Sequence, residues 1–334
     1  MMNKTVAAIL WCCFITVFFA GGVWAESQRW KIGHVRPSGS AVDKDIRLLI
    51  EQIENGTGGA IEIDIYPANK LGDYSVVQER VSFGEVEMYV GPFGTAIDKR
   101  VGLAFAPFLV STWDEARKVY FQGSVLFEQM AEFLEPQNIK LIGGWPVYFG
   151  GIALTREPVQ PGNPDIKKEM IIRVPPIRSF ERTARVLGYT PYPITWTYAK
   201  MGLKTGMVEG IIGGGAEGYL GLKGIIKYYL PIKDHFEYWF VYMNLDLWNS
   251  LPEKTRTLVR NLSREIEIRR YAVAEREERD SIDKLAKQGV EIINFSEKER
   301  ALIREKVKEA VWPEMRKEIG EAFDAVTSLT GISK

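Results

Sequence analysis

Strand-like and helix-like patterns alternate along most of this 334-residue chain. Residues 30–35 have the pattern of a first strand, and apolar residues at helical spacing between 46 and 53 predict a helix after it. Residues 61–66, 74–83 and 86–90 continue with strand, helix and strand. Units in this order form a parallel sheet with helices on both faces. We therefore predict an α/β fold.

The rest of the chain continues this alternation. Further strands are expected at 140–145, 149–154, 207–212, 236–242 and 290–295, and helices at 112–134, at 179–187 and from Ser296, with Glu299 as its capping-box partner. A charged helical pattern from 252 to about 288 is long enough to run across two domains. The chain is also longer than the number of residues that usually fold around one hydrophobic core. We expect domain I to comprise residues 26–148 and 237–276, and domain II residues 149–236 and 277–334.

The N-terminus has the pattern of a secretory signal peptide. Lys4 precedes an apolar stretch from 6 to 20, and small residues then lead to Val23-Trp24-Ala25. An uncleaved anchor is the alternative, but the stretch is short for a membrane span. Cleavage after Ala25 would remove both cysteines, Cys12 and Cys13, so no disulfide or cysteine metal site is expected. We predict export through the inner membrane to the periplasm.

Composition argues against several classes of function. Lys and Arg total 43 and Asp and Glu total 43, so no charge excess suggests a nucleic-acid partner. His34 and His235 are the only histidines, and no HExxH motif, nucleophile elbow or phosphate-binding glycine loop is present. No metal or cofactor is therefore expected. An exported hydrolase would need a nucleophile–base pair or paired carboxylates, and no arrangement singles one out. The pattern favours a protein that binds without reacting.

Arg173 is a charge within the apolar, strand-like run 170–176, which ends in two prolines. An arginine keeps its proton, so in a buried strand it needs an anionic partner. Its planar fork matches a carboxylate bidentately. The partner could be an internal Asp or Glu, or a bound ligand. This run alone favours the internal salt bridge, because unpaired buried charge is rare.

Six stretches, in order along the chain, carry a resemblance to a known family: YPANKLG at 66–72, GEVEM at 84–88, APFL at 106–109, IRVP at 172–175, GMVEG at 206–210 and LWNSLP at 247–252. With them the chain resembles the solute-binding proteins of tripartite ATP-independent periplasmic (TRAP) transporters, the C4-dicarboxylate-binding-protein-like (DctP) group. The resemblance covers nearly all of the mature chain. It implies a two-domain periplasmic-binding-protein fold with a ligand cleft between the domains and a long domain-spanning helix.

The resemblance also changes the interpretation of Arg173. It implies that this arginine clamps the carboxylate of a ligand in the cleft, where strand ends of open α/β sheets bind their ligands. It further implies that the membrane subunits of the transporter are the protein partners and that the receptor performs no chemistry. We expect a monomer. A receptor that signals to a sensor kinase would have the same sequence features and stays an alternative.

Two departures from the family pattern bear on the ligand. The second arginine of many members is replaced around Gly151 and Ile152, although Arg156 could reach the cleft instead. A polar element after the Val-Glu-Gly turn is replaced by residues 211–215, Ile-Ile-Gly-Gly-Gly, which would make room for a bulky group. We expect one carboxylate and an apolar or aromatic body, as in an aromatic or indolic acid or its 2-oxo relative. A C4-dicarboxylate is the alternative.

Aromatic side chains at strand ends supply the remaining candidates, although such rings are more often core than ligand wall. The predicted ligand-binding residues are Arg173, Trp145, Phe149, Pro175, Trp196, Gly213, Gly214, Tyr219, His34, Phe93 and Trp239.

Overall fold

The computed structural model describes residues 27–330. The predicted signal peptide, residues 1–25, and its cleavage site lie outside the described residues. Within 27–330, no helix combines the length and the apolar character needed to cross a membrane.

A first sheet of five strands has the order β2-β1-β3-β10-β4. Its strands are β1 (Gln28–His34), β2 (Ile61–Tyr66), β3 (Met88–Gly91), β4 (Ile139–Phe149) and β10 (Phe236–Asn244). The crossover helices α1 (Ala41–Gly56) and α2 (Tyr74–Ser82) join β1, β2 and β3, which run parallel. The strand β10 is antiparallel to both of its neighbours, so the sheet is mixed and not wholly parallel as expected.

A second sheet of six strands has the order β11-β9-β5-β8-β6-β7. Its strands are β5 (Gly151–Leu154), β6 (Ile171–Val174), β7 (Thr190–Pro193), β8 (Gly210–Gly214), β9 (Tyr228–Leu230) and β11 (Glu291–Ile292). The strand β6 is parallel to β7 and β8, whereas β5 is antiparallel to β8 and β9. The helices α5 (Arg178–Val186), α6 (Trp196–Lys204) and α7 (Ala216–Tyr219) follow β6, β7 and β8.

The chain passes between the two sheets at adjacent points. The paired strands β4 and β10 lie in the first sheet, and β4 continues through Gly150 into β5 of the second. The Gly150 amide donates to the His235 carbonyl at 2.8 Å, just before β10 begins. A Cβ atom at residue 150 would lie 2.1 Å from the His235 ring, so this approach requires glycine. The predicted domain boundaries at 148/149 and 236/237, which stay a prediction, lie beside this crossing.

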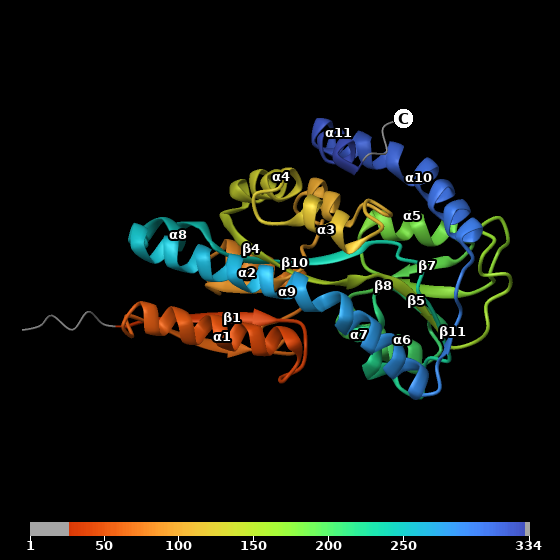
Figure 1. Cartoon of the computed structure of the whole chain (residues 1–334), viewed down its shortest axis with the longest axis horizontal. Coiled ribbons are helices and arrows are strands. Elements are labelled where there is room, and N and C mark those ends of the chain that lie inside the picture. Colours follow the sequence, from red (N-terminus) through yellow and green to blue (C-terminus); the bar gives the residue numbers. More distant parts are fainter. Residues whose placement is uncertain (1–26, 331–334) are drawn as a thin grey trace, which may run out of the picture.

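The long helix α9 (Glu253–Lys287) is a third connection. It packs on β4 and α1 of the first sheet and on α7 and β11 of the second, and Figure 1 shows it running between the two halves. Its bounds agree with the helical pattern predicted from 252 to about 288. The predicted α/β class, with a long helix joining two sheets, is confirmed.

The remaining elements cover the sheets. They are η1 (Lys99–Phe105), α3 (Trp113–Tyr120), α4 (Val125–Leu134), η2 (Glu135–Gln137), η3 (Leu220–Leu222), α8 (Leu245–Ser250), α10 (Glu297–Ile319), α11 (Glu321–Thr327) and η4 (Ser328–Thr330). The helix expected at 112–134 is divided, because Gly123 has a φ of 87° and Ser124 caps α4 by accepting from the Phe127 amide. The predicted capping box of Ser296 and Glu299 is present.

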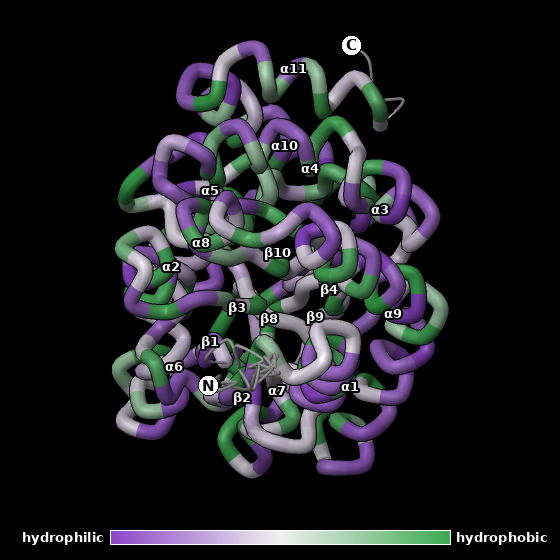
Figure 2. Tube along the Cα trace, turned by 90° about the vertical axis from the view of Figure 1, so that its left-hand side faces the viewer, coloured by the Kyte–Doolittle hydropathy of each residue, from purple (hydrophilic) through white to green (hydrophobic). Residues whose placement is uncertain are grey.

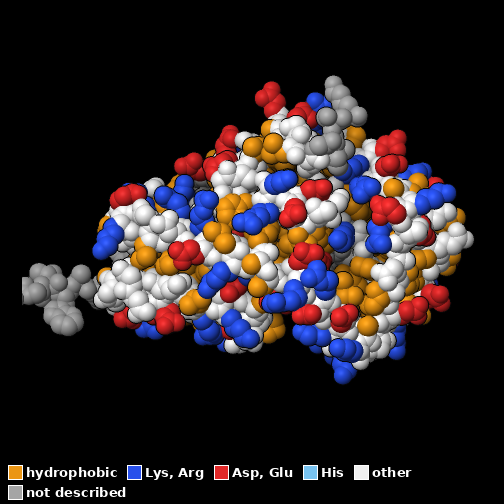
Figure 3. Space-filling model, viewed as in Figure 1, with side chains coloured by type: hydrophobic (Ala, Val, Ile, Leu, Met, Phe, Trp, Pro, Cys, Tyr) orange, Lys and Arg blue, Asp and Glu red, His pale blue; other side chains and the backbone are white. Residues whose placement is uncertain are grey.

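Charged, polar and apolar residues are mixed on the outside of the molecule. Helices such as α5 and α10 change between hydrophilic and hydrophobic residues along their turns (Figure 2), as expected for helices that cover a core. Basic and acidic side chains are interspersed over the face shown in Figure 3. This distribution agrees with the equal totals of basic and acidic residues.

Glu267 is a buried carboxyl group on the inner face of α9. It accepts a hydrogen bond from the Tyr238 hydroxyl at 2.6 Å. The backbone N–H of Gln122 also donates to it, with the nitrogen 3.2 Å from both of its oxygens. Burial raises the pKa of Glu267 to about 7, against the lowering effect of these hydrogen bonds. The unfolded chain therefore releases this proton at lower pH than the folded protein.

We predict that Glu267→Gln flattens the pH dependence of stability. As pH rises from about 4.5 to about 7, the unfolded state ionises first, so wild type loses up to about 3 kcal/mol through this residue. The glutamine variant should not have this loss. Urea unfolding at pH 5 and pH 8 measures the difference, with Glu265→Gln on the exposed face of α9 as the matched control. Parallel profiles for wild type and Glu267→Gln would contradict the prediction.

Candidate ligand-binding site

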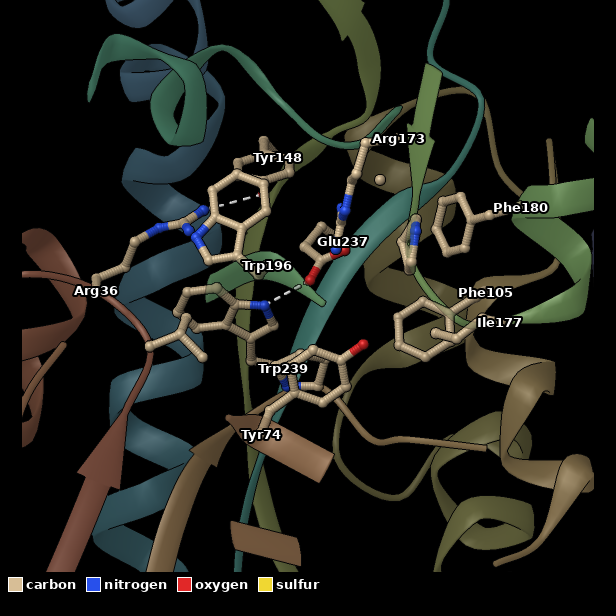
Figure 4. A pocket seen from close by; sticks show the side chains of 14 residues that line it. Arg36, Tyr74, Phe105, Tyr148, Arg173, Ile177, Phe180, Trp196, Glu237 and Trp239 are labelled. Carbon is tan, nitrogen blue, oxygen red and sulfur yellow. Dashed lines mark hydrogen bonds between the residues drawn. The ribbon is translucent and has the colours of Figure 1, made fainter. Parts of the chain in front are cut away.

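A cavity of about 40 Å³ lies between the two sheets (Figure 4). Its lining comes from both: Val35, Arg36, Tyr74, Pro92, Phe105, Tyr148, Arg173, Pro175, Ile177, Phe180, Trp196, Gly213, Glu237 and Trp239. Several of these residues directly follow the carboxyl ends of parallel strands, as Arg36 follows β1 and Pro175 follows β6. Open α/β sheets bind ligands at such strand ends.

Arg173 lies on β6 and is only 1% exposed. Its Nε donates to the Ile194 carbonyl at 2.8 Å and its Nη1 to the Ile212 carbonyl at 3.2 Å, which fixes the guanidinium at the cavity wall. Burial lowers the pKa of Arg173, but an arginine stays charged all the same. Among the described residues, no Asp or Glu forms an ion pair with Arg173. The internal salt bridge that the sequence run alone favoured is therefore absent from this part of the chain.

Arg36 is a second arginine in the cavity wall, and it is 6% exposed. Its Nε donates to Glu217 at 2.9 Å and its Nη2 to the Tyr148 hydroxyl at 3.0 Å. Its guanidinium lies 5.2 Å from the centre of the Trp196 ring and 5.0 Å from that of Trp239. Burial lowers the pKa of Arg36, but the charge of Glu217 and the contact with Tyr148 raise it above its ordinary value overall. Unlike Arg173, Arg36 has its charge neutralised within the protein.

The contacts of Arg36 cross between the sheets. Arg36 follows β1 of the first sheet, whereas Glu217 belongs to α7 and Trp196 to α6, both beside the second. Thr197 of α6 adds two further links, since its hydroxyl accepts from Asn69 at 3.3 Å and donates to Asp73 at 3.0 Å. The two halves are therefore joined over the cavity by side chains as well as by the crossing strands.

Glu237 places a carboxylate in the same wall and is 7% exposed. Its Oε1 accepts from the Trp239 indole N–H at 2.6 Å, and its Oε2 lies 3.2 Å from His235 Nε2. The other ring nitrogen of His235 lies 2.7 Å from Asp234. Burial lowers the pKa of His235, but the two acids raise it to about 10 overall. His235 is thus charged at neutral pH and donates to both carboxylates.

Five of the predicted ligand-binding residues line the cavity, namely Arg173, Pro175, Trp196, Gly213 and Trp239. Two other predicted residues lie behind the lining residues and contact them. Trp145 stacks on Trp239 with ring centres 5.4 Å apart, and Tyr219 stacks on Trp196 at 6.3 Å. These rings support the wall and do not line it.

The other four predicted residues lie outside the cavity lining. His34 is buried, with Nε2 3.1 Å from Asp43. Phe93 packs against Phe240 and Tyr242 in the core of the first sheet, and Phe149 packs against Trp113 and Phe236. Gly214 lies against Tyr219, whose ring would be 2.8 Å from a Cβ atom at this position.

The triple glycine has a different role from the one expected. A Cβ atom would meet Pro175 at 2.3 Å from residue 213 and Tyr148 at 2.4 Å from residue 215. Gly213 also has a φ of 82°, which favours glycine. The glycines therefore admit the rings of Pro175 and Tyr148, and Gly213 lines the cavity beside Pro175.

Sequence reasoning missed Arg36 and Glu237 as lining residues, and it looked for a second cation in the wrong place. Arg156 pairs with Glu209 at 2.7 Å and does not line the cavity. Arg36 could have been found as a basic residue directly after the first predicted strand. Glu237 could have been found as the acidic residue in the aromatic run 236–242.

Comparisons with known proteins agree with this architecture. The model of the DctP family, described as bacterial extracellular solute-binding protein, family 7, matches residues 32–318. The C4-dicarboxylate-binding periplasmic protein DctP of Rhodobacter capsulatus is 22% identical over 339 aligned positions that cover 99% of each chain.

Two solved structures share the fold. A TRAP periplasmic solute-binding protein of Desulfovibrio salexigens, with bound orotic acid, has a TM-score of 0.83 at 19% identity and covers 91% of this chain and 98% of its own. One of Haemophilus influenzae, with bound L-gulonate, has a TM-score of 0.83 at 22% identity and covers 92% and 100%. With the family model spanning both sheets and the cavity between them, the chain belongs to the DctP family of bacterial extracellular solute-binding proteins.

Proposed function

We propose that this protein is the periplasmic receptor of a TRAP transporter and that Arg173 clamps the carboxylate of an organic acid. The observation that carries the proposal is the buried guanidinium of Arg173, which lines the cavity and has no ion-pair partner among residues 27–330. A carboxylate provides the charge and the bidentate geometry that such a group needs. The solved relatives hold orotic acid and L-gulonate, both carboxylic acids.

The ligand carries one carboxylate and an apolar or aromatic body. Rings and aliphatic groups supply most of the wall, including Phe105, Ile177 and Phe180 around Arg173. The second arginine, Arg36, already has Glu217 as its partner, so it offers no free charge to a second carboxylate. Burial of the apolar body gains roughly 25 cal/mol for each Å² removed from water.

Ligand entry and release follow from movement of the two halves about their connections. A cavity of about 40 Å³ has room for only a few water-sized groups, so an organic acid enters when the sheets separate. The crossing at Gly150 and the helix α9 are the connections that would bend. Closure then forms the surface that the membrane subunits recognise, and the receptor itself performs no chemistry.

Arg173→Ala should weaken binding of the organic acid by at least ~2 kcal/mol, because the carboxylate would be buried without its charge-assisted hydrogen bonds. Arg173→Lys should also bind poorly, since an ammonium group cannot reproduce the planar fork. Calorimetry measures both affinities, and circular dichroism checks that each variant is folded. Arg178→Ala, which removes a surface pair with Glu318, is the matched control. Unchanged affinity in folded Arg173→Ala would refute the assignment.

A thermal-shift screen should separate monocarboxylates from dicarboxylates. Succinate, malate and fumarate should give little shift, because burying a second carboxylate without a partner costs on the order of several kcal/mol. An aromatic or branched monocarboxylate at 100 times its dissociation constant should stabilise the protein by about 2.7 kcal/mol. A strong response to a C4-dicarboxylate, with none to the monocarboxylates, would show that the ligand class is wrong.

Small-angle scattering should detect closure around the ligand. The radius of gyration should fall when a tight ligand is added, because the two halves approach each other about the crossing strands. Identical scattering profiles with and without saturating ligand would argue against the hinge.

A further inference from the structure

Arg173 and Glu237 are unlike charges that line one cavity without forming an ion pair. Each is held separately: Arg173 by the carbonyls of Ile194 and Ile212, and Glu237 by Trp239 and His235. Figure 4 shows both side chains facing the same space. Within the described residues, the ion-pair partner of Glu237 is His235. The fold therefore keeps an acceptor and a donor apart across the cavity.

The hydrogen bonds of Glu237 determine what it can still bind. Each of its oxygens faces one N–H group, from Trp239 for Oε1 and from His235 for Oε2. A carboxylate oxygen has two acceptor positions, so each oxygen retains one. With two donors already in place the group is an acceptor, and each oxygen can accept one further hydrogen bond. Arg173, in contrast, can only donate hydrogen bonds.

The charges around the cavity do not cancel in pairs. Arg36 is neutralised by Glu217, but the single imidazolium of His235 lies between two carboxylates, those of Asp234 and Glu237. Arg173 therefore carries a positive charge without an ion-pair partner among the described residues, and the group of Asp234, His235 and Glu237 carries one net negative charge. A ligand that meets only Arg173 would leave Glu237 buried beside an apolar surface, which is unfavourable for a polar group.

We propose that Glu237 is a specificity-determining residue, and that the ligand is a carboxylic acid with a hydroxyl or amino group directed at Glu237. This rests on the proposed function, in which Arg173 takes the carboxylate. Because Arg173 and Glu237 line the same cavity of about 40 Å³, we expect the donor group close to the carboxylate in the ligand. An acid that has hydrogen or a 2-oxo group in place of the hydroxyl or amino group has no donor for Glu237. A 2-oxo oxygen would also face the Glu237 carboxylate with a second acceptor.

The experiment is calorimetry with matched sets of acids that differ at one carbon. One set is 3-phenyllactate, phenylalanine, phenylpyruvate and 3-phenylpropionate, and the other is 2-hydroxyisovalerate, valine, 2-oxoisovalerate and isovalerate. In wild type, the hydroxy or the amino member should bind at least ~10-fold more tightly than the oxo and unsubstituted members, since a site built to hydrogen-bond a donor rejects the analogue without it. Comparison of the hydroxy and amino members identifies which donor is used.

Glu237→Gln tests the residue itself. A glutamine side chain can present an N–H group, so the preference for hydroxy or amino acids should fall at least ~10-fold and the 2-oxo acid should gain in relative affinity. Glu209→Gln is the matched control, because Glu209 pairs with Arg156 outside the cavity. It should leave the ranking unchanged.

Four outcomes are distinguished. Equal binding of donor-bearing and donor-free acids overturns the role of Glu237 and leaves the carboxylate receptor intact. A ranking that survives in folded Glu237→Gln also overturns it. If the variant fails to fold, the wild-type ranking of the matched acids still decides. If no acid of either set, and none in the wider screen, binds wild type, the proposed function fails and this inference fails with it.

Discussion

A buried positive charge without a counter-charge among residues 27–330 is the constraint around which the cavity is arranged. Two backbone carbonyls, those of Ile194 and Ile212, hold the Arg173 guanidinium in place but leave its charge unneutralised. Ile194 directly follows β7 and Ile212 lies within β8, so the arginine also ties neighbouring strands together. Every other charged group in the wall has a partner. The free energy of the buried charge is therefore the term that an anionic ligand can lower most.

The positions of the wall residues depend on how the chain passes between the sheets. The close contact of Gly150 with His235 brings β4 and β10 side by side as they leave the first sheet. His235 then lies between Asp234 and Glu237, which sets the orientation of Glu237 toward the cavity. One backbone crossing thus determines both the path of the chain and the placement of the acceptor group.

Local patterns were sufficient to predict the α/β class, the long helix and the capping box at Ser296. They also identified Arg173, because a charge in an apolar strand is visible in the sequence itself. Trp145 and Phe149 could not be distinguished from lining residues, since the sequence does not show which face of the strand turns to the cavity and which to the core. Arg36 was missed because its place in the cavity wall depends on contacts far along the chain, such as the one with Tyr148, 112 residues away. Glu237 was missed because its place depends on sheet pairing. Residues 237–276 were expected in domain I, but the antiparallel direction of β10 was not predicted, because periodicity does not encode strand direction.

The stacking of Arg36 between Trp196 and Trp239 has a consequence for the protein without ligand. This guanidinium and its partner Glu217 join the two halves over the cavity, so under the proposed hinge they would favour the closed arrangement before an acid binds. A pre-existing closed population lowers the free energy that a ligand must supply for closure, and apparent affinity rises with that population. Ion pairs weaken with ionic strength, although burial reduces the screening. Under the proposed closure, salt concentration would change the apparent affinity only as far as it screens the partly exposed side chain of Glu217.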